Sequence, residues 1–298
     1  MNTTQRVIKY IAMAFALGLA LFIILMVVNG VFFGMSLLDN ILGRDGGLPS
    51  DGVYDYSQSF SDVRSLEIDH DVGLLTIIVG DEFRVDAKNE DRGISVELKD
   101  GTLKVKNKKD FGLFNWGGDQ NRTIITIPGD FVAEEVELET GAGKVSIERL
   151  AAKEMDIKTG AGSFTAKELK SDRAHIEGGV GEVVLRDVDL RNLELECGVG
   201  SLSLTGNVTG TSKVNCGVGE TRLKLTGARS DYRLNLDVGI GAIHVDGEKQ
   251  GKGSYGDSSA QHTLTVEGGV GSVHLDFGAA SSLPDQVRHT LFLWKKAA

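Results

Sequence analysis

Apolar and polar residues alternate in short runs along most of the chain after residue 60. Val136 and Leu138 alternate with glutamates in one run, and Leu193 and Leu195 do the same in a later run. Alternation with a period of two residues is typical of a β-strand that buries one face and exposes the other. The pattern therefore predicts an all-β fold built from many short strands.

The alternating runs are interrupted by a recurring phrase of glycine, a small or branched apolar residue, and glycine. Five copies follow one another at intervals of 19 residues, and two more follow after 22 and 30 residues. Self-similarity at a fixed short period is typical of a repeat architecture. The glycines of the seven phrases are Gly141, Gly143, Gly160, Gly162, Gly179, Gly181, Gly198, Gly200, Gly217, Gly219, Gly239, Gly241, Gly269 and Gly271.

The alternation changes phase by one residue across each phrase. In the first repeat the apolar positions are Val136 and Leu138 before the phrase, and Val145 and Ile147 after it. We therefore expect the second glycine to form a structural corner, where the chain turns and adopts a φ angle that other residues avoid. With this interpretation the phrase accounts for the fold and indicates no ligand.

A second corner is expected near Leu150, Leu169 and Val188, which are again 19 residues apart. Two short strands and two bends per 19 residues fit one rung of a parallel β-solenoid, or β-helix, in which equivalent residues stack in ladders about 4.8 Å apart. No proline lies between Pro128 and Pro284, as continuous strand pairing requires. A β-sandwich of hairpins is the alternative, but hairpins do not require a fixed period.

The N-terminal part of the chain predicts one transmembrane helix. No charged residue occurs from Tyr10 to Leu38, a stretch longer than the ~20 residues that span a bilayer. A cleaved signal peptide is the alternative, but the apolar run is long for one and no small-x-small cleavage site follows. Arg6 and Lys9 precede the run, so the positive-inside rule predicts a signal anchor with a cytoplasmic N-terminus and the rest outside.

These patterns divide the chain into six segments. Residues 62–128 are rich in strands, with a hairpin expected at Asp100-Gly101 and a degenerate phrase at Val72-Gly73, and would form the first coils and an N-terminal cap. The expected segments are a cytoplasmic terminus (1–9), the transmembrane helix (10–38), a flexible tether (39–61), the N-terminal cap and first coils (62–128), the regular solenoid (129–277) and a C-terminal cap or tail (278–298).

Three segments interrupt the regular pattern. Residues 247–256 are rich in glycine and are interpreted as a loop that bulges from one rung. The aromatic stretch Phe111–Gly118 is either a lid over the end of the solenoid or a contact for a membrane or partner. The tail around Trp294 is either a capping element or a membrane-surface contact.

Composition narrows the classes of function. The chain has 298 residues and a net charge of −10, which argues against nucleic acid as a partner. Cys197 and Cys216, the two cysteines of the chain, precede consecutive phrases at the same position. In stacked rungs their Cα atoms would lie about 4.8 Å apart, which permits a disulfide but also fits two buried thiols.

Two candidate cation sites follow from the same stacking argument. His244, Asp246, His274 and Asp276 lie at equal offsets after two phrases and would share one outward patch that could bind a divalent metal, although the same residues are ordinary on a solvated face. Glu177 and Glu196 would stack near Glu139 and Lys158, where calcium or nearby basic residues could relieve their repulsion. Solvation alone suffices for both sets, so we expect no bound metal and no cofactor.

No catalytic motif is present. Serines and histidines are scattered, and the glycine phrases do not join a strand to a helix as a phosphate-binding loop would. We therefore expect no enzyme, and a carbohydrate-acting β-helix enzyme is the least favoured alternative.

The chain resembles a bacterial family of membrane-anchored β-strand-repeat proteins regarded as candidate adhesins, a domain of unknown function. The resemblance rests on the apolar start, the segment Val63–Ile68, the turn Gly80–Val85 and the glycine phrases, and covers roughly residues 60–277. It implies a solenoid displayed outside the cell and provides no catalytic residues. The apolar C-terminal tail departs from the family pattern.

The sequence thus predicts a single-pass protein of the bacterial cell envelope that presents an extracellular β-solenoid as a binding or adhesion module. An envelope protein or a polysaccharide is the expected ligand, since stacked ladders offer an extended regular surface. The alternative is the ectodomain of a regulatory membrane complex that senses envelope stress.

Overall fold

The computed structural model describes residues 56–88, 94–107 and 122–278. The predicted transmembrane helix, the Phe111–Gly118 stretch and the tail from residue 279 onward lie outside the described residues, as does the tether up to residue 55. In the described ranges, no helix is long and apolar enough to cross a membrane.

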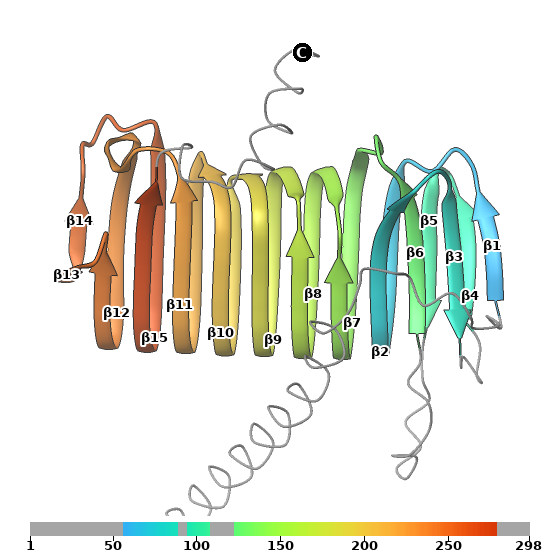
Figure 1. Cartoon of the computed structure of the whole chain (residues 1–298), viewed down its shortest axis with the longest axis horizontal. Coiled ribbons are helices and arrows are strands. Elements are labelled where there is room, and N and C mark those ends of the chain that lie inside the picture. The colour runs from blue at the N-terminus through green and yellow to red at the C-terminus, as the bar shows by residue number, and fades with distance from the viewer. Residues whose placement is uncertain (1–55, 89–93, 108–121, 279–298) are drawn as a thin grey trace, which may run out of the picture. The chain divides into compact units, whose positions relative to one another are not determined.

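The described chain is almost entirely β-structure, with one short 3-10 helix at Arg229–Asp231 (Figure 1). Eight long strands pair in parallel and form the body of the solenoid. The predicted all-β solenoid is therefore confirmed for this part of the chain. In spatial order these strands are β2 (Ser65–Gly80), β7 (Ala133–Ile147), β8 (Leu150–Lys167), β9 (Leu169–Arg191), β10 (Leu193–Thr209), β11 (Thr211–Thr226), β15 (His262–Gly278) and β12 (Tyr232–Val245).

In the central rungs each residue pairs with the residue 19 positions further along the chain. Leu138 pairs with Ile157, Ile157 with Ile176, and Ile176 with Leu195, and all four side chains are buried. The core is therefore a set of aliphatic ladders that run along the solenoid, with Phe164 the largest fully buried side chain. Burial of these ladders supplies the main stabilisation of the fold.

The central rungs carry three inward-facing pairs each, whereas the sequence predicts only two strands and therefore two such pairs per rung. In the rung that begins at Leu150, the buried pairs are Leu150 with Ala152, Met155 with Ile157, and Phe164 with Ala166. The alternation changes phase between Ala152 and Met155 as well as at the two expected corners. This additional change of phase leaves two successive residues, Lys153 and Glu154, exposed, and it adds a third side to the rung.

The two rungs at the C-terminal end are not stacked in chain order. β15 lies between β11 and β12, so the last strand in the sequence is the penultimate one in space. The interpretation of residues 247–256 as a bulging loop is wrong in part. β13 (Glu248–Gln250) and β14 (Gly253–Tyr255) pair antiparallel with β12 and cover its outer edge, which would otherwise expose unpaired backbone groups.

Shorter strands close the N-terminal end. β5 (Thr102–Asn107) pairs with the first half of β2 and β6 (Arg122–Pro128) with its second half, both in parallel. β4 (Ile94–Lys99) and β5 form the hairpin expected at Asp100-Gly101. β3 (Phe83–Lys88) pairs with β6, and β1 (Tyr56–Phe60) with β3. Together, β5 and β6 therefore cover the outer edge of β2, each along one half of the strand.

Candidate functional site

The glycine phrases lie at one corner of the rung, where neighbouring backbones approach closely. Gly200 has a φ of 146°, and a Cβ at this position would overlap the carbonyl oxygen of Gly181 in the next rung. A Cβ at Gly198, the first glycine of the same phrase, would overlap the carbonyl oxygen of Gly179. Both glycines of the phrase are therefore required by the fold, and we call this edge the glycine corner.

The middle residues of the phrases form one continuous row of exposed apolar side chains, which we call the apolar ridge. The six larger members expose between 38% and 71% of their surface. They stack in register over all eight long strands, a length of about 34 Å at one rung per 4.8 Å. In spatial order the ridge consists of Val72, Ala142, Ala161, Val180, Val199, Val218, Val270 and Ile240.

A groove runs beside the apolar ridge across the five strands β7–β11, and we call it the glycine groove. Its floor consists of the first glycines of the phrases and the small residues before them, such as Thr159, Gly178 and Cys197. Its volume is about 500 Å³. The groove exists because two successive small positions separate the ridge from a row of longer side chains. That row, the acidic wall, consists of Glu139, Lys158, Glu177, Glu196 and Asn215.

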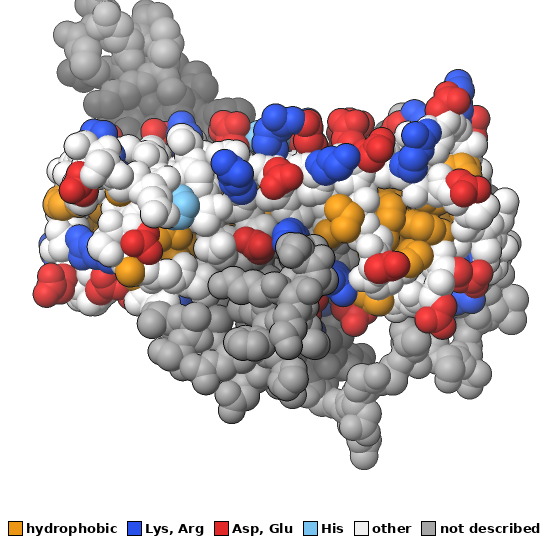
Figure 2. Space-filling view, turned by 90° about the horizontal axis from the view of Figure 1, so that it is seen from above, with side chains coloured by type: hydrophobic (Ala, Val, Ile, Leu, Met, Phe, Trp, Pro, Cys, Tyr) orange, Lys and Arg blue, Asp and Glu red, His pale blue; other side chains and the backbone are white. Residues whose placement is uncertain are grey.

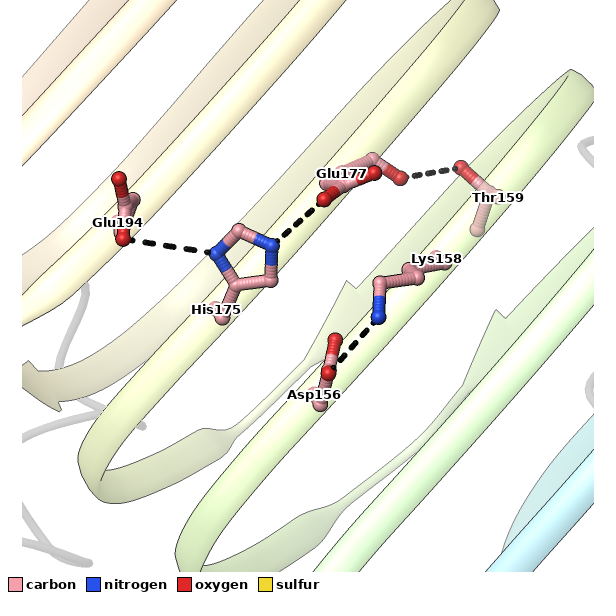
Figure 3. A network of polar contacts seen from close by, with 6 residues as sticks. All are labelled: Asp156, Lys158, Thr159, His175, Glu177 and Glu194. Carbon is pink, nitrogen blue, oxygen red and sulfur yellow. Dashed lines mark hydrogen bonds and ion pairs between the residues drawn. The ribbon is translucent and has the colours of Figure 1, made fainter.

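Polar contacts within single strands and between neighbouring rungs hold part of the acidic wall (Figure 3). The Lys158 Nζ lies 3.0 Å from an Asp156 oxygen, and the His175 Nε2 lies 2.8 Å from a Glu177 oxygen. The Thr159 hydroxyl donates a hydrogen bond of 3.2 Å to the Glu177 carbonyl oxygen. Lys158 is thus neutralised by a carboxylate outside the wall, which leaves the glutamates as the dominant charges there.

Charged side chains of both signs are distributed along the solenoid in the view of Figure 2, with exposed hydrophobic side chains between them. Some charged side chains of the solenoid are paired with a neighbour, as in the Lys213–Glu267 pair at 3.0 Å and the Lys170–Asp189 pair at 3.6 Å. Such exposed pairs contribute little to stability.

Cys197 and Cys216 are register partners on β10 and β11, and both are free thiols in the structure. A hydrogen bond with Cys216, together with burial, raises the pKa of Cys197. The same hydrogen bond lowers the pKa of Cys216. Both cysteines are small, partly buried side chains, and Cys197 lines the floor of the glycine groove.

The structure brings together only two of the four candidate metal ligands. The His244 and His274 rings stack with centroids 5.0 Å apart and planes inclined by 7°. Asp246 instead accepts a hydrogen bond of 2.8 Å from the Phe277 N–H and lies 3.7 Å from Arg229. No group of three or more histidines, cysteines or carboxylates that could bind a metal ion is found in the described part of the chain. Glu177 and Glu196 are register partners.

Sequence reasoning missed the apolar ridge and the glycine groove. The sequence pattern predicts corners at the phrases but does not predict where the residue between the two glycines points. The available signal was that the middle residue is always alanine, valine or isoleucine, although it lies at the corner itself, between two glycines.

Solved structures with a similar chain course include three that are named as candidate adhesion proteins. The cell adhesion protein from Clostridium sporogenes is 16% identical, with 75% of this chain and 98% of that chain covered and a TM-score of 0.31. The adhesin from Bacteroides fragilis is 15% identical, with 77% and 100% covered and a TM-score of 0.42. The adhesin from Parabacteroides distasonis is 12% identical, with 76% and 98% covered and a TM-score of 0.36.

No curated protein matches the chain significantly. The profile of the Toastrack family, DUF4097, matches residues 63–272, a range that runs from the start of the N-terminal cap into β15. This match covers more than two thirds of the chain and confirms the family resemblance seen in the sequence. The chain belongs to the Toastrack family, DUF4097.

Proposed function

We propose that the chain is a non-catalytic binding module, anchored in the cell membrane by residues 10–38, with the solenoid outside the cell. The anchor and its orientation are supported by the uncharged stretch from Tyr10 to Leu38 and by Arg6 and Lys9 before it. The role in binding is supported above all by the apolar ridge.

The apolar ridge supports binding because no described part of the chain buries it. An aliphatic side chain that stays half exposed forgoes stabilisation of about 25 cal/mol for each Å² left in water. Eight such residues in one unbroken row form a surface that a partner can bury on contact. A protein partner is favoured over a polysaccharide, because sugar hydroxyl groups lose hydrogen bonds to water when they pack on aliphatic side chains.

The membrane topology is tested with the full chain in intact bacterial cells. We expect it to stay in the membrane fraction after an alkaline wash and to be degraded by protease added outside the cells. Protection of the solenoid in intact cells, with degradation only after lysis, would contradict the proposed orientation.

The binding role is tested by capture of envelope proteins with the full chain and with the variant Val180→Ser/Val199→Ser/Val218→Ser. Val132→Ser is the matched control, because Val132 is a valine exposed by 51% that lies outside the ridge. We expect proteins retained by the wild type and by the control to be lost from the ridge variant. Equal retention by all three chains would overturn the role of the ridge.

A further inference from the structure

The glycine groove places two chemically different rows of side chains along one line. The acidic wall lines one side of the groove, and along each strand the apolar ridge follows the wall after two small residues, which are threonine, glycine or cysteine. Across β7–β11 the groove is about 19 Å long, at four steps of 4.8 Å. This length accommodates about six residues of an extended polypeptide, which advances 3.3 Å per residue.

Two carboxylates of the acidic wall are free to bind a cation on a partner. Glu139 and Glu196 form no ion pair or hydrogen bond with any residue that the structure describes. They lie three rungs apart, a distance of about 14 Å. Glu177, between them, has one carboxylate oxygen engaged by His175 at 2.8 Å. A partner with positive charges spaced along its length would therefore meet three carboxylates of the wall, with Lys158, which is paired with a carboxylate outside the wall, between Glu139 and Glu177.

The charges of the groove argue against two other occupants. A second copy of the chain would bring its own acidic wall against this one, and the net charge of −10 adds general repulsion. A membrane surface rich in anionic lipids would be repelled by the same carboxylates. Charge complementarity thus favours a partner that is cationic and also carries aliphatic side chains for the ridge.

We propose that the glycine groove binds an extended, positively charged peptide segment in which basic and aliphatic residues alternate. In an extended chain alternate side chains point to opposite sides. Basic side chains would then face the acidic wall while aliphatic ones pack on the apolar ridge. The backbone of the groove is already used in pairing between rungs, so recognition comes from side chains rather than from strand addition. This proposal rests on the proposed binding function.

The test uses the full chain in an uncharged detergent and a fluorescently labelled peptide of alternating lysine and valine. Fluorescence anisotropy measures the affinity for the wild type, and a peptide of alternating glutamate and valine serves as the negative control. We expect the lysine peptide to bind and its affinity to fall as salt concentration rises. Failure of the lysine peptide to bind more tightly than the glutamate peptide would overturn the proposal.

Three variants locate the binding site. Glu139→Gln/Glu196→Gln and Val180→Ser/Val199→Ser should each weaken binding by about tenfold. Glu168→Gln/Asp187→Asn removes the same number of charges at the opposite side of the rung and should leave the affinity within about twofold. If Glu139→Gln/Glu196→Gln binds the peptide as tightly as this control, the proposal of a cationic partner is wrong. The capture experiment with the ridge variant decides the binding function separately, because it does not depend on the charge of the partner.

Discussion

Two corners of the same rung show how differently this solenoid turns its chain. The glycine corner has glycine at both ends of each phrase and an exposed aliphatic residue between them. At the opposite corner the positive φ angles belong to Glu168, at 47°, and Asp187, at 52°, and their neighbours Lys167 and Arg186 are also exposed. The glycine corner is apolar in every rung, whereas the opposite corner is charged at Glu168 and Asp187 and has Gly206, at a φ of 143°, in β10.

The contrast between the two corners shows which residues of the glycine corner are required for folding and which are not. The backbones at the glycine corner approach so closely that a Cβ would overlap the neighbouring rung, whereas Glu168 and Asp187 carry exposed side chains at the opposite corner. The charged corner also shows that an exposed turn in this solenoid does not need an aliphatic side chain. The glycines of each phrase are therefore explained by folding, and the ridge residues between them by the binding that we propose.

The largest expected effect is at a second glycine of the glycine corner. Gly200→Val should destabilise the solenoid by more than about 4 kcal/mol, because a branched side chain is strained at a φ of 146° and would overlap the backbone of Gly181. Chemical denaturation followed by circular dichroism measures the loss. The outward-facing Glu194→Gln serves as the control and should stay within about 0.5 kcal/mol of the wild type. A Gly200→Val protein as stable as this control would contradict the claim that the corner requires glycine at this position.

A substitution at the opposite corner should cost less. Asp187→Val places a branched side chain at a φ of 52° without a backbone overlap, so the expected loss is about 1–2 kcal/mol. Asp187→Asn should be close to neutral, because asparagine tolerates this conformation. Equal losses for Asp187→Val and Gly200→Val, measured by the same denaturation, would mean that close backbone approach is not what distinguishes the two corners.

A smaller effect concerns pH at the N-terminal rung. Burial lowers the pKa of His70 below its ordinary value of 6.5, and its Nε2 has no hydrogen-bond partner. The unfolded chain therefore takes up a proton at higher pH than the folded protein does. The free energy of unfolding should fall as pH drops below about 6.5, by at most about 1.4 kcal/mol per pH unit from this group.

His70→Thr, which copies the ladder neighbour Thr140, should reduce this dependence. The measurement is the free energy of unfolding of both proteins between about pH 7 and pH 5. The difference between the two curves isolates His70 from the many carboxylates that titrate at lower pH. Parallel curves for wild type and variant would contradict the assignment.

The regular rungs could be predicted from sequence because each repeats one pattern. The 19-residue interval places Cys197 beside Cys216 and Glu177 beside Glu196, and the structure has both pairs in register. In these two cases local spacing determines which residues become neighbours. The degenerate phrase Val72-Gly73 lies opposite Ala142-Gly143, a pairing that the 19-residue interval does not predict.

The ends and the groove could not be predicted in this way. The insertion of β15 between β11 and β12 depends on how β13 and β14 cover the last edge, which is a long-range choice that no local interval encodes. The glycine groove arises from two rows of side chains that face each other across small residues, so it appears only once the rungs are stacked. The exposure of the ridge residues could not be predicted either, because the glycines on both sides of each one interrupt the alternating pattern.

The central claim, that the apolar ridge is not required for folding, is tested most directly by the free energy of unfolding of Val180→Thr/Val199→Thr/Val218→Thr. Threonine keeps the branched shape that suits a strand, so the account predicts a loss of less than about 0.5 kcal/mol per site. A loss of several kcal/mol in total, comparable to that of Gly200→Val, would show that the ridge stabilises the solenoid itself and would contradict the account.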